Sequence, residues 1–115
     1  MPLIKLHIPN QLNEEKKGQL LSTLSKIVAE DSGKPEKYVM ALIEKASIMM
    51  SGRAGESAFV DIRGIGGLTK EVNRKISKHI SELLSREIGI KPERIYITFI
   101  DIPASNWGWN GEIFG

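Results

Sequence analysis

The same local sequence signal occurs twice in this chain, and it constrains the fold more than any other feature. Residues 33–38 read Gly-Lys-Pro-Glu-Lys-Tyr, and residues 89–94 read Gly-Ile-Lys-Pro-Glu-Arg. In both places a helical pattern stops at a glycine, and a lysine, proline and glutamate lead into an apolar segment. Glycine and proline end many helices, so chance similarity is the alternative. The shared order and near-equal spacing favour an internal β-α-β repeat, with halves at about 1–56 and 57–115 of a single domain.

The hydrophobic pattern predicts the same kinds of element in each half. The first half should hold a strand over Leu3–Ile8, a helix from about Asn13 to Asp31, a strand over Tyr38–Glu44 and a loop over Met49–Glu56. The second half should hold a strand over Ser57–Ile62, a turn over Gly64–Gly67, a helix capped by Thr69 and reaching Ile88, and a strand over Arg94–Ile102. The predicted class is α+β: two β-α-β repeats forming one four-stranded sheet, with two helices on one face.

The second face of such a sheet has no helix to cover it. Lys5 and His7 lie on that face of the first strand, but the later strands are too apolar to remain open to water. A sheet covered on one side only indicates association with another chain. The segment 103–115 carries Trp107, Trp109 and Phe114 among glycine and asparagine residues, which predicts docking against a neighbouring subunit.

Composition excludes several classes of function. The chain has no cysteine, so it can form no disulfide, thiol nucleophile or thiolate metal site. Its sixteen basic and fourteen acidic side chains are interspersed, which argues against a nucleic-acid partner. His7 and His79 have no neighbours at metal-ligand spacing, so we expect no metal and no cofactor. No apolar run approaches a membrane span, and the first residues do not resemble a signal peptide, so we expect a cytoplasmic protein with no membrane partner.

Motifs spread over nearly the whole chain resemble the macrophage migration inhibitory factor family of the tautomerase superfamily. They are Met1-Pro2 before a strand, Ser-Gly-Lys-Pro at 32–35, Gly-Ile-Gly at 64–66, Asn-Arg at 73–74, Lys-Pro-Glu-Arg-Ile-Tyr-Ile at 91–97 and Asn-Trp-Gly-Trp-Asn at 106–110. Each motif alone is weak, but together, in order and at the family's spacing, they are specific. The resemblance implies a homotrimer with three active sites at subunit boundaries, each formed around one subunit's Pro2 and completed by its neighbour.

The resemblance also implies an activity, keto–enol tautomerisation of a small aromatic 2-keto acid similar to phenylpyruvate. The alternative is a signalling protein that binds a cell-surface receptor, as the vertebrate cytokine of the family does, and that leaves cells without a signal peptide. A trimer whose pocket binds ligands without turning them over is a third reading. Nothing in the sequence demands a receptor.

Pro2 is the candidate catalytic residue, because the resemblance assigns the base to the N-terminal proline. Initiator methionine is commonly removed before a small residue, and the product would begin with a free secondary amine. An α-amino group has a pKa of about 7.7–8.0, which burial and a nearby cation both lower toward neutral pH. A base tuned in this way suits proton transfer from carbon. If Met1 stays attached, the Pro2 nitrogen is an amide without a usable lone pair, and proline then only stiffens the start of the chain.

The resemblance assigns substrate binding to Lys34, the backbone of Ile65 and Tyr96. The Lys34 ammonium can bind a carboxylate and help to keep Pro2 unprotonated; a lysine favoured by the end of a helix is the alternative, and the two roles are compatible. Ile65 lies in a glycine-rich turn before a helix, where the backbone can approach a ligand closely. Tyr96 matches a phenol that enters the neighbouring subunit's pocket; a tyrosine that packs across the sheet is the less favoured alternative.

Trp107, Trp109 and Phe114 match the aromatic rim of the family's pocket, although Trp107 could equally contribute to a subunit interface. Two departures put the familiar substrate in doubt. Thr98 stands where the vertebrate cytokine has an asparagine that hydrogen-bonds ligand, and Trp107 replaces a smaller aliphatic residue. Ser57 and Val60 occupy the positions of the family's Cys-x-x-Cys pair, so the thiol–disulfide activity attributed to that motif is excluded.

Overall fold

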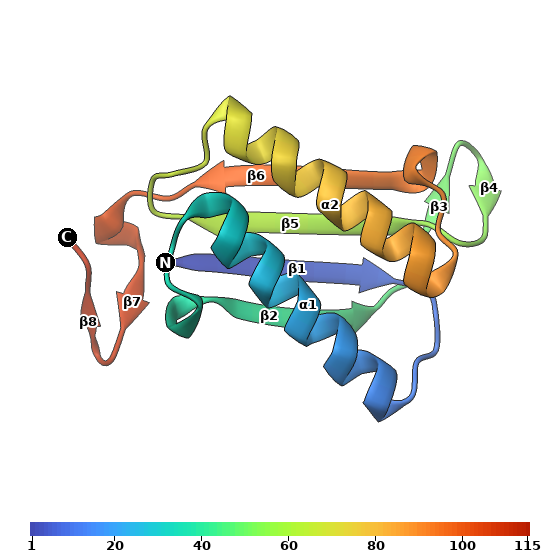
Figure 1. Cartoon of the computed structure of the whole chain (residues 1–115), viewed down its shortest axis with the longest axis horizontal. Coiled ribbons are helices and arrows are strands. Elements are labelled where there is room, and N and C mark those ends of the chain that lie inside the picture. Colours follow the sequence, from blue (N-terminus) through green and yellow to red (C-terminus); the bar gives the residue numbers. More distant parts are fainter.

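The computed structural model describes residues 1–115, and it has one four-stranded sheet with two long helices across one face (Figure 1). The strand order is β2-β1-β5-β6. The main elements are β1 (Pro2–Ile8), α1 (Glu14–Ser32), β2 (Met40–Lys45), β5 (Ala58–Gly64), α2 (Lys70–Ile88) and β6 (Ile95–Asp101). β1 is parallel to β2, β5 is parallel to β6, and β1 runs antiparallel to β5. The predicted pair of β-α-β units in one sheet is therefore confirmed.

Both helices end as the repeated signal predicts, and both begin at a side-chain cap, of which Thr69 was predicted. The side chains of Asn13 and Thr69 accept hydrogen bonds from the backbone N–H groups of Lys16 and Val72. Each helix ends at a glycine with positive φ, 74° at Gly33 and 70° at Gly89, a conformation that costs other residues more. A short 3₁₀ turn follows each glycine, η1 (Glu36–Tyr38) and η2 (Pro92–Arg94).

The 3₁₀ turns correct one strand boundary. The sequence predicts a strand from Tyr38, but Tyr38 ends η1, and β2 starts only at Met40. The Tyr38 N–H bonds back to the carbonyl of Pro35 at 3.1 Å, which holds this residue in the turn. Its aromatic ring is consequently placed at the end of the sheet rather than within it.

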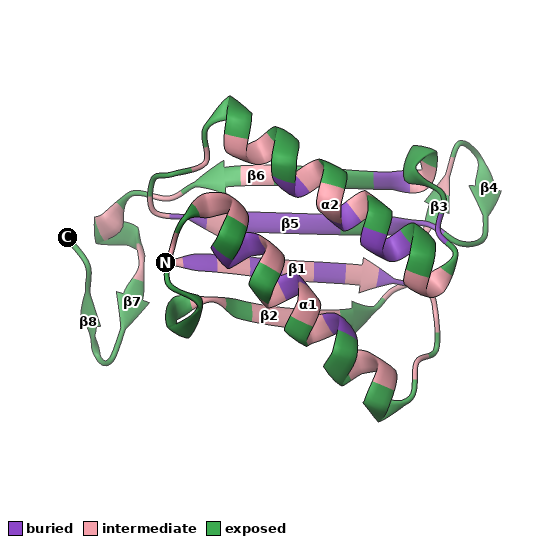
Figure 2. Ribbon diagram, viewed as in Figure 1, coloured by how far each residue is buried: buried purple, intermediate pink, exposed green.

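The hydrophobic core lies between the sheet and the helices, where buried residues of both layers face each other (Figure 2). Burial alternates along β1, so that Ile4, Leu6 and Ile8 are fully buried under the helices. The central members of the core from the other elements are Leu20, Leu24, Val28, Val60, Ile62, Ile76, Ile80 and Leu84. The apolar stripe of each helix thus meets the inward face of β1 and β5.

The opposite face of the sheet has no helix and carries large exposed apolar side chains. Phe59 is 37%, Ile100 41% and Tyr96 67% exposed. Asp61 is only 5% exposed on this face, and its carboxylate accepts hydrogen bonds from Arg63 Nε at 3.0 Å and Thr98 Oγ1 at 2.9 Å. An apolar face that surrounds a buried carboxylate matches the predicted uncovered side of the sheet.

Two short hairpins stand at opposite ends of the sheet (Figure 1). The segment predicted as a loop over Met49–Glu56 contains the hairpin of β3 (Met49–Met50) and β4 (Arg53–Ala54), which Arg94 fixes by donating to three backbone carbonyls. Beyond the start of β1 lies the hairpin of β7 (Gly108–Trp109) and β8 (Glu112–Ile113), which follows η3 (Ala104–Asn106). Neither helix has the apolar composition needed to cross a membrane.

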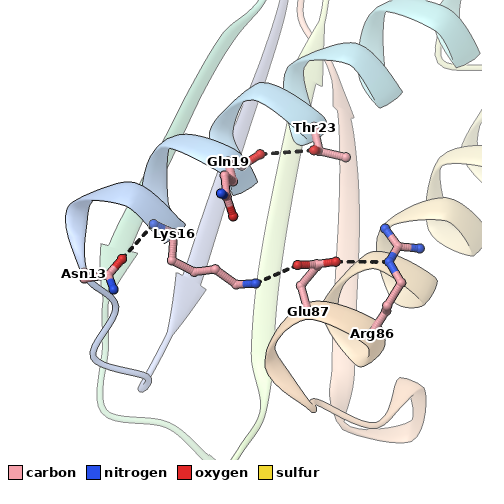
Figure 3. A network of polar contacts seen from close by, with 6 residues as sticks. All are labelled: Asn13, Lys16, Gln19, Thr23, Arg86 and Glu87. Atoms are coloured by element: carbon pink, nitrogen blue, oxygen red, sulfur yellow. Dashed lines mark hydrogen bonds and ion pairs between the residues drawn. The ribbon is translucent and has the colours of Figure 1, made fainter.

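Polar contacts join the two helices near both ends of α1. Near the start of α1, Lys16 Nζ lies 2.6 Å from Glu87 Oε1, and Arg86 Nε lies 3.1 Å from Glu87 Oε2 (Figure 3). The hydrogen bond from Lys16, supported by that from Arg86, lowers the pKa of the Glu87 carboxyl. At the other end of α1, Asp31 Oδ2 lies 2.6 Å from His79 Nδ1, with the Asp31 side chain 11% exposed.

Replacing His79 by alanine should lower the free energy of unfolding by about 1 kcal/mol, because the mostly buried Asp31 carboxylate then loses its partner. The measurement is urea denaturation at neutral pH. Lys78→Ala is the matched control, since Lys78 is exposed on the same helix and makes no ion pair. Equal stability of the two variants would show that the Asp31–His79 contact contributes nothing.

Candidate active site

Pro2 is buried at the first position of β1, at the corner where three strands and a glycine-rich turn meet. It pairs in register with Gly64, which in turn pairs with Asp101 of β6. Proline has no N–H to donate, and the start of a strand tolerates this. This strand pairing therefore holds the beginning of the chain at the end of the sheet from which the loop 64–67 leaves.

Two hollows adjoin this corner. The first, called here the Lys37 hollow, measures about 430 Å³ and is mostly apolar, with Pro2, Lys37, Tyr38, Trp107 and Trp109 among its lining residues. The second, the Phe114 hollow, measures about 440 Å³ and is lined by Met1, Tyr38, Ile65, Ala104, Trp109 and Phe114. Met1, Tyr38 and Trp109 line both hollows, so the Met1 residue lies where they meet.

Aromatic rings form the wall that the hollows share. Trp109 stacks on Phe114 with ring centres 5.9 Å apart and planes inclined by 15°, and the Tyr38 and Trp109 rings are nearly perpendicular with centres 6.3 Å apart. The hairpin of β7 and β8 is tied closed by the Phe114 N–H, which donates to the Trp107 carbonyl at 3.2 Å. Within its own chain, Trp109 thus packs on Tyr38, and the expected docking of these aromatics on a neighbouring subunit stays a prediction.

Lys34 reaches the glycine-rich turn from the end of α1. Its Nζ donates to the carbonyls of Ile65 at 2.6 Å and Gly66 at 2.8 Å. Gly67 has φ of +80°, and a Cβ there would lie 2.8 Å from Lys34 Cε, so a glycine is needed for this approach. The Ile65 N–H donates no hydrogen bond in this structure and remains available to a ligand.

Asp101 fixes the same turn from the other side, and sequence reasoning missed it. Its Oδ1 accepts a hydrogen bond from the Gly66 N–H at 2.7 Å. The Ile102 N–H also donates to the Gly64 carbonyl at 2.8 Å. A single aspartate at the end of a strand carries no motif, and only the register of β5 with β6 shows that it faces this turn.

The electrostatic environment at this corner favours a neutral amine. Burial first, and then the charge and hydrogen bond of Lys34, lower the pKa of the terminal amine of Met1 below its usual value of 8.0. An amine held here is therefore deprotonated at lower pH than an ordinary chain terminus. Lys34 and Ile65, two of the residues assigned from the sequence, thus lie beside the start of the chain.

Tyr96 and Thr98 lie away from the corner within one chain. Tyr96 pairs with Phe59, which pairs with His7, and this places Tyr96 roughly 17 Å along the strands from the level of Pro2. The Thr98 hydroxyl donates to Asp61 on the open face of the sheet. A single chain therefore brings together Pro2, Lys34, Ile65 and the three rim aromatics, but not these two side chains. No three side chains of the types that bind metals come together anywhere in the chain.

The fold and this corner define a β-α-β-β-α-β protein with its N-terminus in an apolar, lysine-flanked site. The family model described as "Macrophage migration inhibitory factor (MIF)" matches residues 1–115. The chain therefore belongs to the macrophage migration inhibitory factor family, as the sequence motifs indicated.

Individual relatives support this assignment. The macrophage migration inhibitory factor of Meriones unguiculatus is 36% identical over 96 residues, which are 83% of this chain and 84% of that protein. The homolog of Brugia malayi is 34% identical over 96 residues, again 83% of this chain and 84% of the relative. Both alignments span most of each protein, so the similarity is not confined to one motif.

Solved structures agree over the whole chain. The homologue from Prochlorococcus marinus superposes with a TM-score of 0.92 at 35% identity, covering 98% of this chain and 99% of the other. The protein from Toxoplasma gondii gives a TM-score of 0.94 at 29% identity, covering 97% and 99%. A protein solved after inactivation by 2-oxo-3-pentynoate shares the fold with a TM-score of 0.87 at 22% identity, covering 97% of this chain and 94% of that one.

Proposed function

We propose that the chain, after removal of Met1, is a keto–enol tautomerase for aromatic 2-keto acids similar to phenylpyruvate. The observation that carries the proposal is the position of the chain's beginning, in a mostly apolar site beside the Lys34 ammonium and the unpaired Ile65 N–H. This setting lowers the pKa of an amine, and a neutral amine is the base that the reaction needs. No sequence motif for another acid–base pair lies nearby.

In this proposal the Pro2 nitrogen moves the proton. It accepts a proton from the carbon next to the ketone while the carbonyl oxygen gains one from solvent to form the enol. In the opposite direction, the protonated Pro2 returns the proton to that carbon while the enol hydroxyl loses its own to water. The apolar walls exclude water from the amine and so keep its pKa low.

The remaining residues of the corner would hold the substrate. Lys34 uses two of its three N–H bonds on the carbonyls of Ile65 and Gly66, so the third can donate to a carboxylate oxygen. The Ile65 N–H offers a second donor close by. Trp107, Trp109 and Phe114 would enclose the aromatic ring.

A homotrimer is part of the proposal. The uncovered sheet face, with Phe59, Tyr96 and Ile100 exposed, provides a surface that another subunit can bury. Tyr96 is distant from the corner of its own chain, which fits a residue that completes the neighbour's site. Thr98 would be less available as a donor to a ligand in that site, because its hydroxyl proton is already donated to Asp61.

A second candidate is a signalling ligand for a cell-surface receptor, which the similarity to macrophage migration inhibitory factors of rodents favours. We propose that the enzyme acts in the cytoplasm; the signalling role would also require its release from the cell. A receptor pull-down with wild type and Pro2→Gly separates the two roles, because receptor binding without turnover favours the second.

Covalent labelling with 2-oxo-3-pentynoate tests the assignment of Pro2. A neutral amine adds to an alkyne that is conjugated to a ketone, so the free Pro2 nitrogen should form one covalent adduct per chain. Peptide mass spectrometry then shows which residue carries the adduct. Protein that retains Met1 serves as the control and should give no adduct on Pro2. Labelling of lysines alone, with Pro2 unmodified in Met1-free protein, would refute the proposal.

Asp101 should act as a positioning residue for carboxylate binding. Asp101→Ala should raise KM about tenfold and leave kcat within about twofold, because the Gly66 N–H loses its acceptor and the turn bearing the Ile65 N–H loosens. Asp101→Asn keeps an acceptor and should restore KM, and Glu93→Ala is the exposed acidic control. A variant that changes melting temperature but not KM would contradict this role.

A further inference from the structure

Lys37 carries an ammonium group that the proposed reaction does not use. Its Nζ lies 5.0 Å from the centre of the Tyr38 ring, and it makes no hydrogen bond or ion pair in the structure. Lys37, Tyr38 and Trp109 all line the Lys37 hollow. An unpaired cation over an aromatic ring at the wall of an apolar hollow is well placed to meet an anion.

No acidic side chain competes for this ammonium in the hollow. Lys37 has the one charged side chain among the ten residues that line it. The adjacent acid, Glu36, turns toward α1, where its carboxylate accepts a hydrogen bond from Ser25 Oγ at 3.0 Å. The positive charge of Lys37 is therefore not neutralised from within its own chain.

The two lysines stand at different ends of the site. Ile65, whose carbonyl accepts a hydrogen bond from Lys34 Nζ, lines the Phe114 hollow, whereas Lys37 lines the other hollow. Met1, Tyr38 and Trp109 lie between them because they line both. Removal of Met1 would join the hollows into one cavity with a cationic group at each end and aromatic rings along its wall.

We propose that Lys37 forms a second anion subsite, so that the preferred substrates are aromatic 2-keto acids with a second carboxylate at the far end of the ring. This inference rests on the proposed function for the placing of the keto acid, with its own carboxylate at Lys34. Lys37 is a specificity residue and takes no part in proton transfer. Because it is exposed, its contribution should be modest and weakened by salt.

The test compares two enol substrates of nearly equal shape and different charge. One is phenylpyruvate with a carboxylate at the para position of the ring, and the other has a neutral carboxamide there. Met1-free wild type should prefer the carboxylate about fivefold in kcat/KM, through KM, as expected for an exposed ion pair. Lys37→Gln should reduce this ratio to about one, and Lys37→Arg should keep it.

Lys75→Gln is the matched control, because it removes one exposed lysine from α2 and should leave the ratio unchanged. Benzoylformate has no enolisable hydrogen, so the binding of its para-carboxylate and para-carboxamide derivatives gives a readout that needs no turnover. A binding preference that Lys37→Gln abolishes, without turnover of either enol, would support the subsite and refute the tautomerase. Equal binding of both ligands, or a preference that survives Lys37→Gln, would overturn the subsite.

Discussion

Protein that retains Met1 should ketonise enol-phenylpyruvate about 100- to 10,000-fold more slowly than protein from which Met1 has been removed, which is the range that a positioned base contributes. The attached Met1 converts the Pro2 nitrogen into an amide, whose lone pair is delocalised into the carbonyl. The Met1 residue also lies where the two hollows meet and would obstruct the substrate. The measurement is the rate of ketonisation for two preparations whose intact masses differ by one methionine.

The comparison needs a control for folding. Thermal unfolding of both preparations should give similar melting temperatures, since Met1 adds nothing to the buried core. Equal rates for two preparations of verified mass would contradict the role of the free Pro2 amine.

Two inactive variants should restore activity when their subunits are mixed. Pro2→Gly lacks the base, and Tyr96→Ala lacks the phenol that we assign to the neighbouring subunit. A mixed trimer contains sites with Pro2 from one chain and Tyr96 from the next. When the two variants are unfolded and refolded together in equal amounts, about one quarter of all sites should contain both Pro2 and Tyr96.

Each variant refolded alone, and the two mixed without unfolding, are the controls. Recovered activity near one quarter of wild type would show that the site spans two chains. No recovery, with trimers formed and Tyr96→Ala inactive alone, would show that Tyr96 acts within its own subunit. Full activity of Tyr96→Ala alone would remove Tyr96 from the site.

The sequence predicted most of the fold, because local rules determine it. The glycines at 33 and 89 adopt the positive φ that their place after a helix requires, and the alternation in β1 gives the buried face of the sheet. The start of β2 was predicted too early, since Tyr38 is apolar enough for a strand but is held in a 3₁₀ turn by Pro35. The β3–β4 hairpin was missed because each of its strands has only two residues.

The site was only partly predictable. Lys34, Ile65 and the rim aromatics follow from motifs, and the structure places them around the start of the chain. Asp101 and Lys37 have no motif, and their roles depend on strand register and on the direction of the 3₁₀ turn. The expected contact of the tail with a neighbouring subunit stays a prediction, and the sequence did not show that the tail forms a hairpin with Trp109 on Tyr38.

The central claim is that the Pro2 amine is the base, and ketonisation of enol-phenylpyruvate by Met1-free wild type and Pro2→Gly tests it most directly. Glycine also permits removal of Met1, so both chains begin with an amine, and intact mass must confirm this for each. We expect Pro2→Gly to lose at least about 100-fold in kcat/KM, because the secondary amine and its fixed position are both lost. Equal rates for the two proteins would contradict the claim.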